Sequence, residues 1–210
     1  VALFVVAVAV GFVARPGRTD GAPMDPQSTA PDGARALRTL LDRYVDEVTT
    51  DGFDETTETV IVLEDGLTSN EDEALEAWVR DGGRLLWLDS RSTFLPVRPA
   101  AASVASGEAQ QVVRGECSIE ELGDLSTLAG SDLRLFATDD ASAVCFATQA
   151  AGSPGGLAAV AAFPLDAGRV IVVDGGRLVD NEQLGEGDNA AMIVRLATAD
   201  DAHAVAVLHP

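Results

Sequence analysis

The 210-residue sequence contains no lysine, so all 14 of its basic residues are arginine, against 34 acidic residues. The resulting net charge of -20 repels nucleic acid and anionic lipid, which argues against binding to either. Without lysine, a phosphate-binding G-x-x-x-x-G-K-[ST] loop is impossible. Two histidines and two cysteines without a C-x-x-C motif make no recognisable zinc set. We therefore predict no metal and no cofactor.

Long apolar runs are also scarce, and the only candidate membrane segment is at the start of the chain. Val1–Ala14 is uncharged but shorter than the roughly 20 residues that span a bilayer. Because the chain begins with Val1, we interpret this run as the end of a longer transmembrane helix. A cleaved signal peptide is the alternative, although bulky Phe12 stands where a small residue is preferred before a cut. Flanking Arg15 and Arg18 locally favour a cytoplasmic side, which leaves the orientation open.

The rest of the chain divides into a linker at residues 15–31, rich in Pro and Gly, and one domain at residues 32–210. The two cysteines, Cys117 and Cys145, lie in one part of that domain. An even pair in an anchored, acidic domain predicts one disulfide in an oxidising compartment, worth roughly 3 kcal/mol. Two unrelated buried thiols are the alternative. We expect the domain on the extracytoplasmic face of the cell membrane.

An apolar stripe at helical spacing predicts a first helix that begins after Gly33 and buries Leu37, Leu40, Leu41 and Tyr44. The β-branched run Thr59–Leu63 is typical of a strand buried on both faces. A helix at Leu67–Gly83 follows and begins with a T-x-x-E capping box. A strand at Leu85–Leu88 completes a β-α-β unit. Trp78 and Trp87 lie in these apolar stripes and are predicted as core residues.

The second half of the domain contains shorter elements. Strands are predicted at Leu133–Ala137, Val144–Thr148, Leu157–Phe163, Arg169–Asp174 and Ala204–Leu208. The first three are expected to form an antiparallel excursion containing the disulfide. Residues 99–111 are predicted as loop, and Ser118 as the cap of a short helix. The fold class predicted is an α/β three-layer sandwich with a mainly parallel central sheet, as in flavodoxin-like folds.

Four features of the sequence resemble the family DUF4350, a domain of unknown function. They are the segments Asp25–Leu41, Leu67–Leu86 and Arg177–Met192 and the pair Cys117 and Cys145. The resemblance implies a membrane-anchored protein with this domain outside the membrane and a second membrane span after residue 210. It also implies a fold like class I glutamine amidotransferase domains, and a system in which MoxR-type ATPases and membrane proteins are neighbours.

The amidotransferase chemistry is not supported by the residues. Active domains of that class place a nucleophilic Cys at a tight turn after a central strand, with a His as its base. Here the strand Leu85–Leu88 is followed by Asp89 and Ser90, and the glycines of a G-x-S-x-G elbow are missing. A hydrolase that uses Ser90 is the least favoured hypothesis. We predict no catalytic residue and no enzyme activity.

Polar residues follow several predicted strands, where ligands bind in open α/β sheets. The candidate ligand-binding edge consists of Asp65, Asp89, Ser90, Asp174, Asn181, Asp188 and Asn189. Carboxylates gathered there can bind sugar hydroxyls or a divalent cation. The ordinary alternative is that these residues only form turns and helix caps, and Asp188 or Asn189 is expected to cap a helix.

These observations favour a non-catalytic extracytoplasmic domain of a membrane-anchored protein. Its expected role is protein interaction or sensing within an envelope complex, with membrane or envelope proteins as partners. The alternative is a ligand-binding module for a cell-wall sugar or a divalent cation at the carboxyl edge of the sheet.

Overall fold

The computed structural model describes residues 21–89, 101–103, 110–130, 133–152, 154–174 and 178–209. The apolar run at residues 1–14 lies outside the described residues. Within the described ranges, no helix is long and apolar enough to cross a membrane.

The helices are α1 (Arg35–Leu41), α2 (Ser69–Arg80) and α3 (Asn189–Ala197), with the 3-10 turns η1 (Glu120–Leu122) and η3 (Ala199–Asp201). The strands are β1 (Glu47–Thr49), β2 (Thr59–Val62), β3 (Arg84–Trp87), β4 (Ala101–Ser103), β5 (Gln110–Val113), β6 (Thr127–Gly130), β7 (Arg134–Ala137), β8 (Ala143–Ala147), β9 (Leu157–Leu165), β10 (Gly168–Val173) and β11 (Ala204–Leu208).

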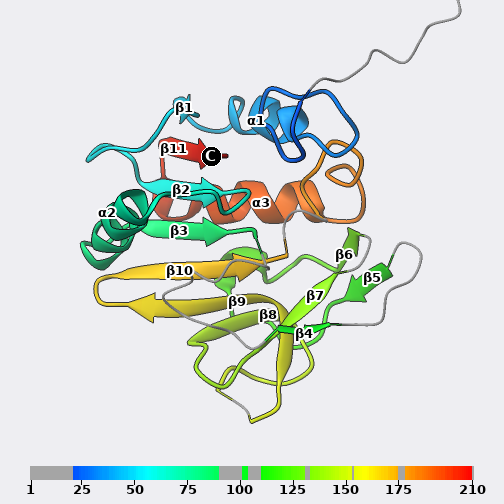
Figure 1. Cartoon of the computed structure of the whole chain (residues 1–210). Coiled ribbons are helices and arrows are strands. Elements are labelled where there is room, and N and C mark those ends of the chain that lie inside the picture. The colour runs from blue at the N-terminus through cyan, green and yellow to red at the C-terminus, as the bar shows by residue number, and fades with distance from the viewer. Residues whose placement is uncertain are drawn as a thin grey trace, which may run out of the picture.

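Among the described residues, nine strands form one mixed sheet (Figure 1). Its order is β1-β11-β2-β3-β10-β9-β7-β4, with β8 also paired to β9. The pairs from β1 to β10 are parallel, whereas all four pairs among β10, β9, β8, β7 and β4 are antiparallel. The predicted mainly parallel sheet is therefore wrong.

The hairpin between β9 and β10 explains this difference. The two strands are joined by a tight turn at Asp166, where φ is 52°, and they pair antiparallel from Leu165 with Gly168 onward. Ala158 of β9 also pairs with Phe136 of β7 and with Ala147 of β8. The predicted antiparallel excursion therefore continues the main sheet instead of standing apart from it. Strands β4 and β5 lie within or overlap the segment that was predicted as loop.

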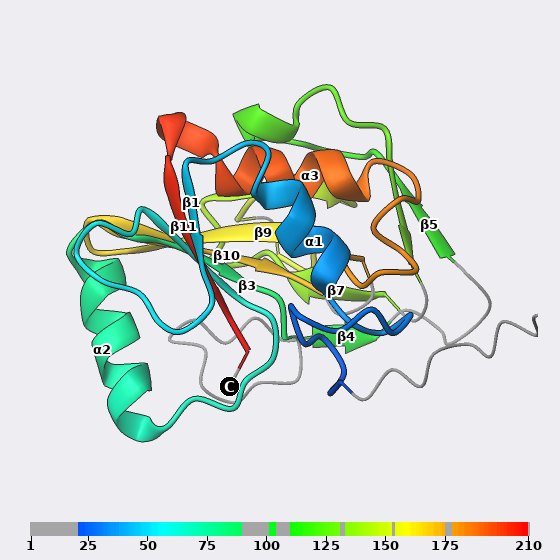
Figure 2. The ribbon, with the colours of Figure 1, turned by 90° about the horizontal axis from the view of Figure 1, so that it is seen from above.

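The helices lie on both faces of the sheet. Alternate residues of each strand point to opposite faces, so Ile61 and Leu86 belong to one apolar cluster and Val62 and Leu85 to the other. Helices α1 and α3 pack side by side on the first face, and α2 lies on the second (Figure 2). The antiparallel half carries the disulfide and the separate two-stranded sheet β5-β6.

Two aromatic residues are more exposed than the sequence predicts. Helix α2 has the predicted capping box, and its Leu75 and Val79 are fully buried, but Trp78 is only partly buried. Helix α1 ends at Leu41, one turn earlier than the stripe requires, so Tyr44 is 61% exposed. Part of each side chain is therefore exposed on the surface of the domain, where it can contact a ligand or a partner.

Candidate functional site

The carboxyl ends of β2 and β3 bring two of the predicted residues together. These strands are parallel neighbours, so the residues that follow them meet at one edge of the sheet. The Asp65 N–H donates to Asp89 Oδ2 over 3.1 Å, and the indole N–H of Trp87 donates to Asp89 O over 3.0 Å. Ser90 lies outside the described residues. Asp89 thus links the ends of two strands.

Asp174 follows β10 at the same edge but is directed to another element. It is 6% exposed, and its Oδ2 accepts a hydrogen bond from the N–H of Arg134 over 2.8 Å. Arg134 is the first residue of β7, so this carboxylate joins the parallel and antiparallel halves of the sheet.

Asn181 fastens the segment before α1 to the body of the domain. Its Oδ1 accepts from the N–H of Ala36 over 2.7 Å, while its Nδ2 donates to Ser28 O over 2.9 Å and Ala30 O over 2.5 Å. Its own N–H donates to Gly33 O. Every one of these bonds is to a backbone group. The Asn181 amide therefore binds this segment through the same backbone groups that a neighbouring strand would use.

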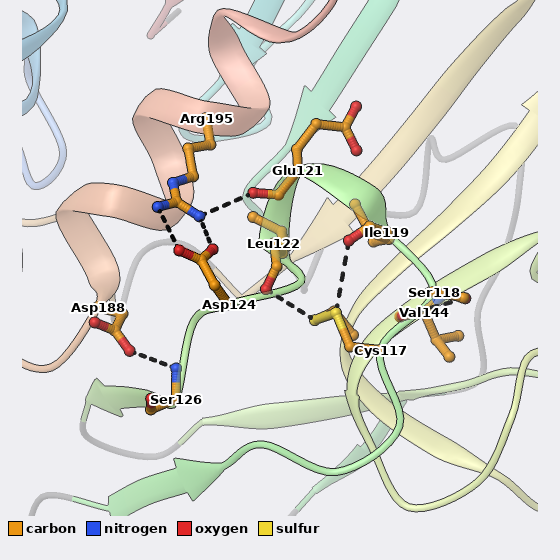
Figure 3. Close-up of a disulfide and its surroundings, with 11 residues drawn as sticks. Cys117, Ser118, Ile119, Glu121, Leu122, Asp124, Ser126, Val144, Asp188 and Arg195 are labelled. Atoms are coloured by element: carbon orange, nitrogen blue, oxygen red, sulfur yellow. Dashed lines mark hydrogen bonds and ion pairs between the residues drawn. A yellow bond between two sulfur atoms is a disulfide. The ribbon is translucent and has the colours of Figure 1, made fainter.

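Asp188 and Asn189 do the same for β6. Asp188 Oδ2 accepts from the N–H of Ser126 over 2.6 Å (Figure 3). It also accepts from the N–H of Thr127 over 2.9 Å. Asn189 is fully buried; its Oδ1 accepts from Ala129 N–H, and its Nδ2 donates to Ala129 O and Gln183 O. The predicted helix cap is wrong. Helix α3 begins at Asn189 and Asp188 occupies its N-cap position, but no side chain makes a capping hydrogen bond there.

The residues of the predicted edge therefore divide into one directly bonded pair and several side chains that bind backbone groups of other segments. Asp65 and Asp89 meet directly, Asp174 binds the backbone of Arg134, and Asn181, Asp188 and Asn189 each bind backbone groups at least 60 residues away in the chain. No group of three or more His, Cys, Asp or Glu side chains in the described ranges is arranged to hold a metal ion.

The ligand-binding edge predicted from the sequence did not include His209, which lies at the same edge. Its side chain is 13% exposed, with Nε2 2.7 Å from Pro23 O and 3.4 Å from Glu64 Oε2. His209 follows β11 just as Glu64 follows β2, and these strands are parallel neighbours. The rule that selected the carboxylates would therefore have selected this histidine as well.

The clamp at Asp188 predicts a pH-dependent stability. Hydrogen bonds from the N–H groups of Thr127 and Ser126 lower the pKa of Asp188 below its ordinary value of 3.8. A lowered folded-state pKa gives stability that is present above the ordinary value and is lost as pH falls through the folded value. We expect Asp188→Asn to lower the free energy of unfolding near neutral pH, with the difference shrinking as the pH falls through the lowered folded-state pKa of Asp188.

Urea denaturation across this pH range checks the prediction. Asp51→Asn, which changes an exposed loop carboxylate, serves as the matched control and should change the free energy of unfolding by no more than about 0.5 kcal/mol. A wild-type advantage over Asp188→Asn that stayed constant down to the acid limit would contradict the role given to this carboxylate.

The structure confirms the predicted disulfide between Cys117 and Cys145. Cys145 lies in β8 and is fully buried, and neither cysteine is free. The neighbouring Ser118 was predicted to cap a short helix. Instead its backbone N–H donates to Val144 O over 2.7 Å, and its Oγ accepts from Val144 N–H over 3.0 Å (Figure 3). The disulfide and these bonds hold the segment before η1 against β8.

A groove of about 560 Å³ lies between α1 and the segment that leads into α3. Its apolar lining comes from Ala36, Leu40, Leu184 and Ala190. Its charged lining comes from Arg35 and Arg43, and Tyr44 follows Arg43 in the chain, three residues after the end of α1.

Comparison with known proteins agrees with the sequence features. Residues 26–197 match the model of the family DUF4350, described as a domain of unknown function. This chain belongs to the DUF4350 family. No curated protein matches it.

Two solved structures resemble the DUF4350 chain weakly. One is a beta-galactosidase from Bacillus circulans sp. alkalophilus, with a TM-score of 0.42 and 11% identity over 69% of this chain. The other is the exo-beta-1,4-mannosidase Op5Man5 from Opitutaceae bacterium strain TAV5, with a TM-score of 0.33 and 14% identity over 67% of this chain. The DUF4350 chain spans 23% of the length of each enzyme.

Proposed function

We propose that this DUF4350 domain is a non-catalytic domain that works outside the cytoplasm by binding protein partners of an envelope complex. The observation that carries the proposal is the groove beside α1, which has apolar lining residues and whose lining residue Arg43 is followed in the chain by the exposed Tyr44. Tyr44 is 61% exposed, and only Val113 among the other described large apolar residues is comparably exposed.

The composition of the groove resembles that of protein interfaces. Binding energy at such interfaces is concentrated in Tyr, Trp and Arg side chains that surround apolar pockets. Here Tyr44 and Arg43 lie at one end of α1, and Arg35 lies at the other. Because both charged side chains in the groove are positive, we infer a partner segment with apolar anchors and at least one carboxylate.

The disulfide supports the location. Disulfides persist in oxidising compartments outside the cytoplasm and are rare in reducing ones. Cys117 and Cys145 are the only cysteines in the sequence, and they are paired. The backbone bonds of Asn181, Asp188 and Asn189 also give these residues structural roles, which favours binding by the groove over chemistry at the carboxyl edge.

A photocrosslinking amino acid at position 44 of the full-length protein in its native host tests the proposal. The matched control places it at exposed Glu73 on α2, away from the groove. We expect a discrete product at position 44 that is absent at position 73 and is lost when Arg43→Glu is added. The same products from both positions, or a product that Arg43→Glu leaves unchanged, would contradict a partner in the groove.

A further inference from the structure

A second, larger hollow of about 720 Å³ lies at the opposite edge of the sheet, where β2 and β3 begin. Its walls come from the end of α2, the loop at residues 53–58 and the turn η3. Its volume falls within the roughly 300 to 1,000 Å³ of small-molecule sites. The partner groove and this cavity have no lining residue in common.

One wall of the cavity is aromatic. The rings of Phe53 and Trp78 lie 5.6 Å apart between centroids at an angle of 58°, and both side chains are partly exposed. The indole rests on Gly83, where an added Cβ would lie 2.5 Å from three of its ring carbons. Trp78 is therefore held in place between a glycine and Phe53 rather than mobile on the surface. Such a ring presents a rigid apolar surface to a ligand.

The polar part of the lining is dominated by carboxylates. They belong to Asp54, Glu55, Glu58, Asp81 and Asp200. Glu58 accepts hydrogen bonds from the N–H groups of His203 and Ala204, and both end on its Oε2. These groups accept hydrogen bonds and repel anions.

Arg84 adds a positively charged hydrogen-bond donor to this lining. It lines the cavity yet is only 7% exposed. Its two terminal nitrogens donate to Ala199 O and to Asp200, while its buried Nε–H has no hydrogen-bond partner among the described residues. An unmade bond at a buried donor is costly, so a ligand that supplies an acceptor gains affinity. Because Nε is covered, the guanidinium must turn slightly towards the cavity to make that bond.

These contacts define the ligand by elimination. Ammonium and guanidinium groups donate hydrogen bonds to carboxylates but offer Arg84 no acceptor, and anions are repelled by five carboxylates. A hydroxyl group both donates and accepts, and the C–H face of a sugar ring packs on an aromatic side chain. We propose that this cavity binds a neutral sugar residue, with its ring against Trp78 and its hydroxyls between Asp81, Glu58 and Arg84. This site is separate from the partner groove.

Intrinsic fluorescence and saturation-transfer NMR test the proposal with cellobiose, maltose and N,N′-diacetylchitobiose as probes. Trp87 is fully buried, so a ligand-induced change in fluorescence reports Trp78. We expect at least one disaccharide to bind with a Kd on the order of 1 mM or tighter. Trp78→Ala should weaken it about tenfold or more, and Asp81→Asn severalfold, while Glu73→Gln on the exposed face of α2 should have no effect. Tighter binding to the corresponding polysaccharide would identify a glycan chain as the source, and equal binding a free sugar.

Salt and competing ligands separate this proposal from its rivals. Sugar binding should be unchanged by added salt, because the ligand is uncharged, and Trp87→Phe should retain the fluorescence response. Failure of all three disaccharides to bind at about 10 mM, or binding that Trp78→Ala leaves intact in a folded variant, would overturn the proposal. Salt-sensitive binding of arginine or spermidine in place of the sugars would overturn it as well.

Discussion

Replacing both cysteines with alanine is expected to lower the free energy of unfolding by about 3 kcal/mol. The disulfide closes a separation of 28 residues, and its loss frees the unfolded chain from that constraint. In the folded domain, Cys145 is fully buried in β8, and the link holds the segment around Cys117 against that strand. For a domain of this size the loss corresponds to a fall in Tm of roughly 6 to 12 °C.

Differential scanning calorimetry with and without a reductant provides the measurement. Reductant should destabilise the wild type by a similar amount and leave the Cys117→Ala, Cys145→Ala double variant unchanged. Two independent buried thiols would behave differently: the wild type would be insensitive to reductant, and that result would contradict the disulfide.

Asn189→Ala is expected to cost at least about 3 kcal/mol, although it removes only a small polar group. The Asn189 amide is fully buried and makes three hydrogen bonds, two with Ala129 and one with Gln183 O at 2.8 Å. Alanine would leave an N–H and two C=O groups without these bonds, and burial makes each unmade bond expensive.

Urea denaturation of Asn189→Ala and of Asn70→Ala compares buried and exposed versions of the same change. Asn70 lies on the exposed start of α2, so its replacement should change the stability by no more than about 0.5 kcal/mol. Equal effects of the two substitutions would show that the Asn189 clamp contributes nothing to β6.

The strands and helices with strong local patterns were predictable from the sequence. Thr59–Leu63 was expected as a strand and corresponds to β2; the helix expected at Leu67–Gly83 corresponds to α2, with the capping box in place. Ala204–Leu208 has the predicted bounds. In these segments, side-chain spacing and capping both act over a few residues, which is the range that a sequence pattern reports.

The sheet as a whole and the site depend on contacts between distant residues. Nothing local to Leu157–Leu165 shows that β9 pairs with both β10 and β8, and this pairing makes the sheet mixed. Likewise, an Asp or Asn beside a helix start predicts a cap, whereas Asp188 binds Thr127 N–H, 61 residues away. Trp78 shows the same limit: its apolar neighbours predict burial, whereas in the fold it packs against the distant Phe53 and lines a cavity together with residues of η3.

The extracytoplasmic location is the claim on which the envelope-binding role rests, and the thiol state of the protein in its native host tests it most directly. Intact cells would be quenched in acid, and the denatured protein then labelled with a maleimide that shifts its mobility in a gel. We predict no labelled cysteine before reduction and two after reduction, because Cys117 and Cys145 are joined. Two labelled cysteines in the unreduced sample would place the domain in a reducing compartment and contradict the account.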